Sequence, residues 1–465
     1  MPAIDTILAA LSFLFLSLAV LVSPWLFAAW EMWYFWPFVA CICAALAFFS
    51  LRLMLRSSAL PEMSPRGAAR VFLGFCLAFL VYAAARFARA EVFMDAERSF
   101  LLFLTPFLIG TVIVFGLSRS QLRALAALLA VNLLALGVYG IVNHALTGSE
   151  KVLWRPGYPQ YILDDRATGS YFCPDHFAGV MELAFCVALG MLLARDSRWY
   201  LRVFGTALAA VALWAVVLSK SRGAGISVAV VMAFAFAWGF GEWPARTRWA
   251  LRLGILVLIG GGVILGAVKA RVYVERFKQY PWRQIEASDR YQMIAAGLRG
   301  WRLAPVFGIG PGMHQNLWPH IAASPDGDPE HGKWPKYPNN TFHSYEVHSD
   351  WTQLMEEYGV VGLVLLLIPA GLLAFLLLSR RSQMLRRRRE DGRGASDYGL
   401  LLGALLAIVA LAFHSLGDFN LQMPATVWML AAIVATPVAH LLREPYSRSR
   451  RSRRTGAGTE ESAPS

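Results

Sequence analysis

The chain has 465 residues, of which 57% are hydrophobic and only 16% charged, with a formal net charge of +13. Repeated apolar runs of about 18 residues or more exclude a soluble globular protein and indicate an integral membrane protein. Barrel strands are short and alternate apolar with polar residues, so the same runs exclude a membrane β-barrel. The sequence therefore predicts an all-α polytopic membrane protein with about twelve transmembrane helices.

The apolar runs place these spans in chain order, with ends accurate to a few residues. They cover residues 7–29, 33–55, 71–90, 99–117, 121–143, 174–194, 200–218, 223–241, 249–268, 351–378, 399–416 and 421–441. No internal repeat is found that would mark a transporter built from two related halves.

The arginines indicate the orientation, because short cytoplasmic loops carry the Lys/Arg excess. The even-numbered connections hold Arg52, Arg56, Arg66, Arg70, Arg119, Arg123, Arg195, Arg198, Arg202, Arg246, Arg248, Arg252 and Arg386 to Arg389. Both termini are therefore expected in the cytoplasm. The basic runs adjoin the spans, so they indicate contact with lipid headgroups rather than nucleic acid.

A long polar stretch, residues 269–348, separates the ninth and tenth predicted spans on the outer side. Connectors between membrane helices are short, so a loop of this length indicates a functional segment. Five histidines lie in it: His314, His320, His331, His343 and His348. We expect the chemistry of the protein on this side of the membrane.

Polar residues also lie at outer span ends earlier in the chain. Arg86 and Arg89 are expected to extend to the membrane surface, with a phosphate contact as the alternative. Arg166 and His176 flank the start of the sixth span, where Pro174 suits the first turn of a helix. These groups either bind substrate or pack between helices.

The turn Ser219-Lys220-Ser221-Arg222 joins the seventh and eighth spans on the outer side. Serine caps, a helix N-terminus and a guanidinium together form a site suited to phosphate. The alternative is a basic turn that anchors the protein to lipid headgroups.

Within the long loop, residues 291–303 have a helical pattern, with Arg290 just before them and Arg299 within them. The glycines of the run Gly308–Gly312 resemble a phosphate-binding loop, but no strand precedes them, so a structural turn is expected. Asp326 and Asp328 could hold a divalent ion, although the flanking prolines also favour turns; we predict no metal.

His348 lies about ten residues before Tyr358, where we expect the lipid-buried part of the tenth span to begin. A continuous helix would place its imidazole roughly 15 Å above that level. An imidazole titrates near neutrality, which suits a general base, although an inert interfacial histidine is the alternative. His414 and Asp418 join the last two spans and are open to either a structural or a binding role.

Taken in order, these clusters resemble the O-antigen ligase and polymerase superfamily of bacterial membrane glycosyltransferases. The resemblance covers roughly residues 166 to 423. Its patterns are Arg166…Gly169…Pro174 to Ala178, Ser219 to Gly223, Arg290…Pro305 to Gly312, His348…Glu357 to Gly362, and His414-Ser415…Asp418 to Leu421. The chain departs from the family at Ser349 and Asp175, where asparagine is common.

The resemblance implies an inverting, metal-independent transfer of a glycan from undecaprenyl diphosphate, without a cofactor. It implies that Arg222 and Arg290 stabilise the diphosphate and that His348 accepts the proton of the attacking hydroxyl. Further substrate-binding residues are expected at Arg166, His176, Lys220, Ser221, Arg299, His414 and Asp418. The acceptor is expected to be lipid A–core, and the active site to be on the periplasmic side of the inner membrane.

On this interpretation residues 1–150 are N-terminal transmembrane helices and residues 151–442 the ligase-like catalytic region, with the periplasmic loop at 269–348. Residues 443–465 are expected to form a disordered basic cytoplasmic tail. Three alternatives stay open: a polymerase of O-antigen or exopolysaccharide repeats, a transporter, or a membrane scaffold.

Overall fold

The computed structural model describes residues 2–55, 67–194, 198–239, 289–322, 343–391 and 395–442. Its α-helices are α1 Pro2–Val22, α2 Met32–Leu55, α3 Gly67–Phe87, α4 Phe93–Thr111, α5 Arg119–Thr147, α6 Pro159–Leu163, α7 Pro174–Leu193, α8 Trp199–Ser219, α9 Arg222–Gly239, α11 Asp289–Leu303, α12 His314–Ile321, α13 Asp350–Asp391, α14 Ala395–His414 and α15 Pro424–Leu442. Shorter turns are η1 Ser23–Trp25, η2 Phe27–Ala29, η4 Val112–Gly116 and η6 Asn420–Gln422, and the strands are β1 Lys151–Val152 and β2 Arg155–Pro156.

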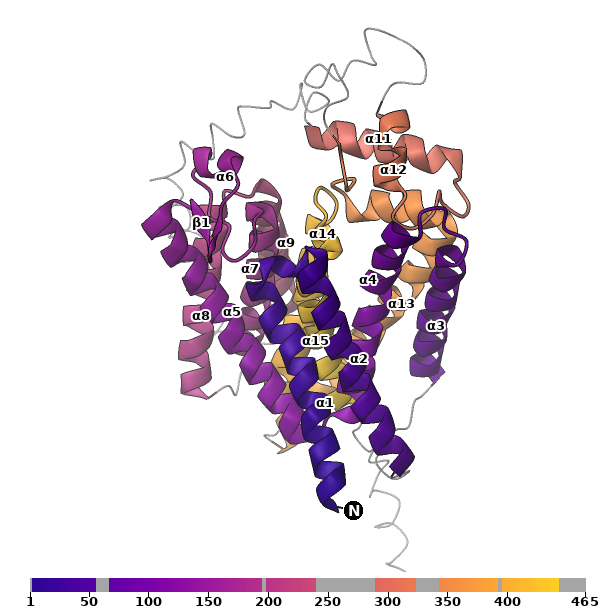
Figure 1. The fold of residues 1–465 in the computed structure, drawn as a ribbon. Coiled ribbons are helices and arrows are strands. Elements are labelled where there is room, and N and C mark those ends of the chain that lie inside the picture. The colour runs from indigo at the N-terminus through magenta and orange to yellow at the C-terminus, as the bar shows by residue number, and fades with distance from the viewer. Residues whose placement is uncertain are drawn as a thin grey trace, which may run out of the picture.

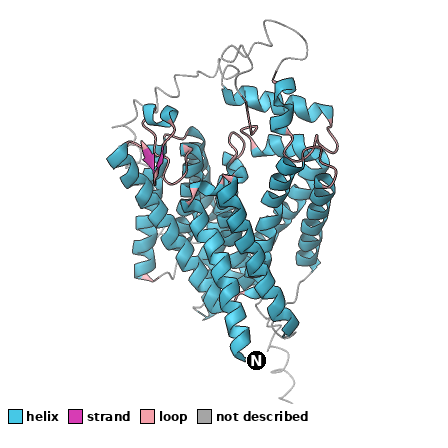
Figure 2. Cartoon of the chain, viewed as in Figure 1, coloured by secondary structure: helices cyan, strands magenta, loops and turns pink. Residues whose placement is uncertain are grey.

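The predicted all-α membrane architecture is confirmed. Long helices run side by side between the two ends of the molecule, and the described strands form one small antiparallel hairpin, β1–β2 (Figures 1 and 2). Eight described helices are long and apolar enough to cross a membrane, and three shorter apolar helices accompany them. The predicted ninth span, residues 249–268, lies outside the described residues, as does the tail after residue 442.

Helix α7 forms the centre of the bundle, because nearly its whole length is buried and it packs against both α8 and α14. The crossing with α14 is close: a Cβ added at Gly190 would lie 2.3 Å from the Gly399 carbonyl oxygen. Small residues allow such contact between membrane helices. Consequently the first turn of α7 and the end of α14 lie together at one end of the bundle.

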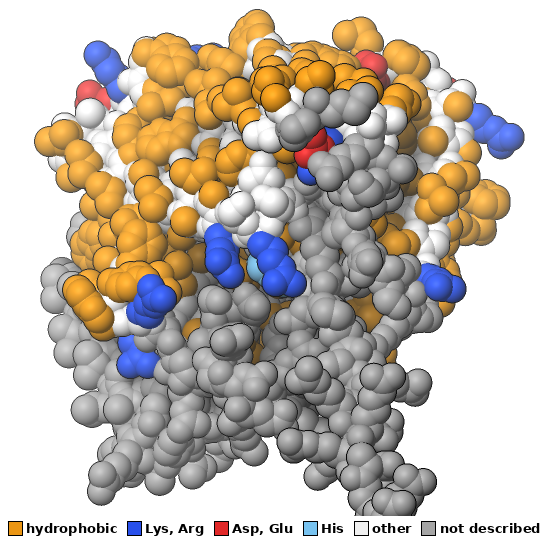
Figure 3. Space-filling model, turned by 90° about the horizontal axis from the view of Figure 1, so that it is seen from below, with side chains coloured by type: hydrophobic (Ala, Val, Ile, Leu, Met, Phe, Trp, Pro, Cys, Tyr) orange, Lys and Arg blue, Asp and Glu red, His pale blue; other side chains and the backbone are white. Residues whose placement is uncertain are grey.

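We call this the upper end, since it is at the top of Figure 1, where α6, α11 and α12 also lie; the N-terminus is at the bottom. The lower end, seen in Figure 3, shows Lys and Arg side chains scattered among hydrophobic ones. This is consistent with the predicted orientation.

Helix α13 is broken at Gly359, whose φ of 67° favours glycine. The carbonyls of Glu356 and Glu357, freed by the break, accept the N–H groups of Ile309 (2.8 Å) and Gly310 (3.1 Å). Residues 350–358 form a short helix that lies across the bundle, below α11 and α12 (Figure 1). Our placement of His348 on a continuous helix, high above the membrane, is therefore wrong.

The glycine-rich run serves as the structural turn that the sequence predicts. Gly308, Gly310 and Gly312 have φ values of 78°, 125° and 69°, and the run packs along the broken part of α13. Arg86 donates to the Gly308 carbonyl (2.8 Å), so it ties α3 to this turn rather than only extending to the membrane surface. Residues 291–303 are helical, as predicted, within α11.

Candidate active site

Asp175 binds two arginines from distant parts of the chain at the upper end. It lies in the first turn of α7, where a carboxylate is favoured by the helix dipole. Its Oδ1 accepts Arg166 Nη2 (2.6 Å) and its Oδ2 accepts Arg290 Nη2 (2.7 Å). Arg166 is buried and also donates Nε to the Ser219 carbonyl (2.7 Å), so this contact joins α7, α8 and α11.

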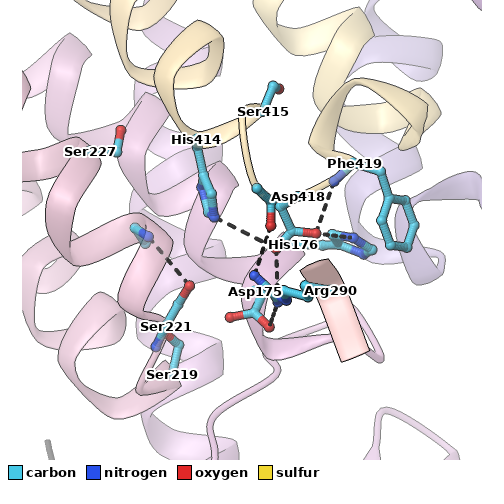
Figure 4. A network of polar contacts seen from close by, with 12 residues as sticks. Asp175, His176, Ser219, Ser221, Ser227, Arg290, His414, Ser415, Asp418 and Phe419 are labelled. Atoms are coloured by element: carbon cyan, nitrogen blue, oxygen red, sulfur yellow. Dashed lines mark hydrogen bonds and ion pairs between the residues drawn. The ribbon is translucent and has the colours of Figure 1, made fainter. Parts of the chain in front are cut away.

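Asp418 is the second carboxylate on Arg290. It lies in the turn between α14 and η6, with Oδ2 3.3 Å from Arg290 Nη2 and Oδ1 3.5 Å from His176 Nε2 (Figure 4). Arg290 Nη1 also donates to the Gly417 carbonyl (2.9 Å). Burial alone would raise the pKa of Asp418, but Arg290, with two neighbouring histidines, holds it well below its usual range.

We call Arg166, Asp175, Arg290 and Asp418 the charge cluster. The charges of its two guanidinium groups and two carboxylates balance. The side chains of Arg166, Asp175 and Asp418 are buried, whereas 36% of the Arg290 side chain is exposed. Arg290 is therefore the member of the cluster that a ligand can reach. Two carboxylates, Asp175 and Asp418, hold its guanidinium in place, and the sequence did not predict either contact.

His414 connects the charge cluster to the interior of the bundle. Its Nδ1 lies 2.7 Å from Glu182 Oε1 and its Nε2 lies 3.7 Å from Asp418 Oδ2. Ser227 donates to the other Glu182 oxygen (2.9 Å). An imidazole between two carboxylates can donate to both only when both its nitrogens are protonated. The network thus continues from Arg290 through Asp418 to a carboxylate on the middle part of α7.

His348 lies beside the charge cluster and shares an aromatic neighbour with His176. The Phe419 ring is 4.6 Å from the His348 ring and 4.4 Å from the His176 ring, centroid to centroid. Burial, and then the positive charge of Arg290, lower the pKa of His348 to about 4. At neutral pH this imidazole is therefore uncharged and able to accept a proton.

His348 also has an uncommon backbone conformation, with a φ of 59°. Histidine and asparagine adopt this left-handed region more readily than most residues, and such conformations concentrate at functional sites. Its Nδ1 is buried without a hydrogen-bond partner among the residues that the structure describes.

The turn before α9 lies next to this network. Ser221 Oγ accepts the Ala224 N–H (3.4 Å) and so caps the helix that begins at Arg222. A Cβ added at Gly223 would lie 2.8 Å from the His414 ring, which places the start of α9 against that histidine. Lys220 points to the loop before α7, where its Nζ donates to the Asp164 carbonyl (2.8 Å).

Arg299 is not brought to the charge cluster. Its Nε donates to the Ile321 carbonyl (2.7 Å) and thereby holds α11 against α12. This contact is structural, and it does not support the predicted role of Arg299 in substrate binding.

Several residues of the site were missed in the sequence. Glu182 lies within an apolar span and Phe419 is one of the chain's 29 phenylalanines. An acid inside a span was the available signal for Glu182, because ionisable residues within membrane segments are rare. Phe419 belongs to the pattern Asp418 to Leu421, but nothing in that pattern indicated that its ring lies against two histidines.

Among the described residues no group of three or more metal-binding side chains is found. Asp326, Asp328 and His331, which we considered as ligands of a divalent ion, lie outside the described residues.

Fold and site together define a polytopic membrane protein with buried, charge-paired polar groups at one end of its helical bundle. Residues 207–367, about a third of the chain, match the family model described as O-antigen ligase. No curated protein matches the chain. The family match confirms the predicted resemblance of this part of the chain to the O-antigen ligase superfamily of bacterial membrane proteins.

The match supports a glycosyltransferase-type membrane enzyme, a ligase or a polymerase, and the family implies lipid-linked glycans as its substrates. The matched region contains Arg222, Arg290 and His348. Asp175 and Asp418 lie outside it and are joined to Arg290 by the fold.

Proposed function

We propose that this protein transfers a glycan from undecaprenyl diphosphate to a hydroxyl group of lipid A–core at the periplasmic face of the inner membrane. The observation that carries the proposal is the position of His348 beside the partly exposed Arg290. A neutral base and a fixed cation are the two groups that this reaction requires at one place.

The cation is needed because the leaving group is a lipid diphosphate, which gains negative charge as the glycosidic bond breaks. Asp175 and Asp418 hold the Arg290 guanidinium in a fixed orientation, so little reorganisation is needed when that charge develops. Arg222, at the positive end of α9, supplies a second guanidinium. Two guanidinium groups can provide this stabilisation without a metal ion.

The base is needed because a sugar hydroxyl is a weak nucleophile. In the proposed step the acceptor oxygen bonds to the anomeric carbon of the donor and its proton passes to His348. The bond from that carbon to the diphosphate oxygen breaks, and undecaprenyl diphosphate leaves with the electron pair. Attack opposite to the leaving group inverts the configuration at the anomeric carbon.

The histidine and the cation are coupled electrostatically. Arg290 contributes to the low pKa of His348, so an anionic diphosphate bound at Arg290 offsets this effect and raises the pKa of the imidazole. His348 therefore becomes a stronger base when the donor is in place.

The acceptor is tested by deleting the gene and separating the surface polysaccharides on a gel. We expect loss of all ladder bands together with accumulated lipid-linked polymer. A single repeat on the core would instead identify a repeat-unit polymerase. Unchanged lipopolysaccharide would contradict both and direct the search to exopolysaccharide, protein glycosylation or transport.

The proposed role of Arg222 in stabilising the diphosphate is tested by comparing a neutral with a charged substitution. We expect Arg222→Ala to lower transfer by about 10²–10³-fold and Arg222→Lys to lower it by about tenfold, because lysine retains the charge but not the paired donors. The measurement is the transfer rate from a purified lipid-linked donor. Arg198→Ala, at the opposite end of the α8–α9 hairpin, is the matched control and should be neutral. Equal rates for the Lys and Ala variants would refute the role.

A further inference from the structure

A further guanidinium group, that of Arg98 on α4, lies near the site and is paired differently from those of the charge cluster. Its Cζ lies 3.9 Å from the centroid of the Trp30 ring, a cation–π contact. Its Nη2 is buried without a hydrogen-bond partner, and no hydrogen bond or salt bridge of Arg98 is found among the residues that the structure describes. Arg166 and Arg290, in contrast, donate to carboxylates and carbonyls.

Aromatic contacts connect Arg98 to the proposed base. The Trp30 ring lies 6.2 Å from the Phe419 ring, centroid to centroid, and Phe419 lies against His348. The order of contacts is therefore Arg98, Trp30, Phe419 and His348, and all four lie at the upper end of the bundle.

The backbone that presents Trp30 is strained. Phe27, Ala28 and Ala29 have φ values of 52°, 61° and 54°, and all three are buried. Each left-handed residue other than glycine costs roughly 1–2 kcal/mol, so three in succession persist only because the surrounding packing enforces them. The strained turn is a reason to assign Trp30 a role beyond filling the core.

Two acids, Glu346 and Asp95, attract Arg98 electrostatically, but each has a carboxylate oxygen that already accepts a hydrogen bond from another side chain. Gln353 Nε2 donates to Glu346 Oε2 and also to Glu357 Oε1 (3.1 Å). Glu346 thus attracts Arg98 electrostatically without occupying its hydrogen-bond donors. In the described part of the chain, these acids balance the charge of Arg98, but no acceptor for its Nη2 is found.

A guanidinium with unoccupied donors at the outer end of a membrane helix is suited to an oxyanion. Phosphate and carboxylate match its fork of N–H groups, and a buried N–H that lacks an acceptor is costly to leave unpaired. An ionisable side chain within a membrane helix is also more often functional than not.

We propose that Arg98, held by Trp30, binds a phosphate or carboxylate group of one of the two glycan substrates, beside His348. That the anion belongs to a glycan substrate rests on the proposed function; the binding of an anion by Arg98 does not. The source is either the diphosphate of the donor or an acidic substituent of the acceptor glycan.

The direct test is binding of inorganic phosphate to the purified full-length protein in detergent micelles, measured by titration calorimetry at low salt. We expect Arg98→Ala to weaken a phosphate site by about tenfold or more, and Arg98→Lys to have an intermediate effect. Arg155→Ala is the matched control: Arg155 also lies over aromatic rings, at 5.0 Å from Phe27, but it is paired with Glu31 at 2.5 Å. It should bind phosphate like the wild type.

Transfer kinetics identify the source of the anion. A raised KM for the donor with unchanged kcat assigns Arg98 to the diphosphate, and a raised KM for the acceptor assigns it to an acidic sugar. If Arg98→Ala does not fold, Arg98→Gln and Arg98→Lys give the same comparison, since they differ in charge. Wild-type phosphate binding by the neutral variant would overturn the proposal even in a protein that transfers glycan as proposed.

Phosphate binding that depends on Arg98, in a protein without transferase activity, would instead refute the proposed function and leave the anion site standing. Phosphate binding that depends on Arg98 but is displaced by neither substrate would mean an adventitious ion only, and would also overturn the proposal.

Discussion

Replacing His348 with Asn is expected to lower glycan transfer by about 10²–10⁴-fold, because the attacking hydroxyl loses its proton acceptor. Asparagine tolerates the left-handed backbone found at this position, so the variant changes the chemistry of the side chain and spares the turn. The measurement is the rate of transfer by purified protein from a lipid-linked donor. Undiminished transfer by the folded variant would exclude His348 as the general base.

The matched control is His343→Ala. His343 lies in the same described segment, residues 343–391, but its side chain is exposed and contacts only Tyr345 among the described aromatic rings. Because it has no contact with the charge cluster, its removal should leave the transfer rate within about twofold of wild type.

The pH dependence of the wild-type enzyme gives an independent test. With a pKa of about 4, His348 is unprotonated at neutral pH and gains a proton only as the pH falls toward 4. We expect kcat/KM to stay level from neutrality down to about pH 5 and to fall below that. The acid limb of kcat should lie at higher pH, because the bound diphosphate offsets Arg290. An acid limb near 6.5 that persists in His348→Asn would place the base elsewhere.

Replacing Asp418 with Asn is expected to have the second largest effect. The substitution removes the negative charge that faces Arg290, His176 and His414, so each of these groups loses one acidic partner. Breaking a buried ion pair in this way costs about 3 kcal/mol of unfolding free energy. Transfer should fall by about 10²-fold or more, since the Arg290 guanidinium loses one of its two carboxylate contacts.

Thermal unfolding and transfer rates, measured on the same preparation, test this prediction. Asp95→Asn is the control: Asp95 accepts one exposed hydrogen bond from Asn316 and should change stability by less than about 1 kcal/mol. The low pKa of Asp418 also predicts how stability depends on pH. The contribution of Asp418 to the free energy of unfolding is complete above about pH 4 and is lost as the pH falls through its folded-state pKa. A stable, fully active Asp418→Asn variant would contradict the assigned role.

Asp175 is one of the two positions at which this chain departs from the pattern of the family that it resembles. Where asparagine is common, this chain has an acid that binds both Arg166 and Arg290. The sequence showed the substitution, but its consequence depends on two arginines that lie 9 and 115 positions away. In the proposed reaction, the diphosphate of the donor would bind a guanidinium that Asp175 already pairs.

The break in α13 shows where local patterns fail. The hydrophobic run from residue 351 onward predicts one helix, and Gly359 by itself is a weak signal. The break is enforced by the turn of residues 305–312, whose N–H groups bond the carbonyls that the break frees. That turn lies more than forty residues earlier in the chain, so no local pattern could reveal the contact.

The sequence by itself determined the membrane class, the order of the helices and the family resemblance, because long apolar runs and short motifs are contiguous along the chain. It also indicated Arg222, Arg290 and His348 as candidates. Only the tertiary structure decided that Asp175 and Asp418 hold Arg290 and that Phe419 joins the two histidines. It also decided that Arg98 lies over Trp30, with no hydrogen-bond acceptor for its Nη2 among the described residues. These contacts join residues far apart in the chain, and they exist only because α4, α7, α11 and α14 pack their upper ends together.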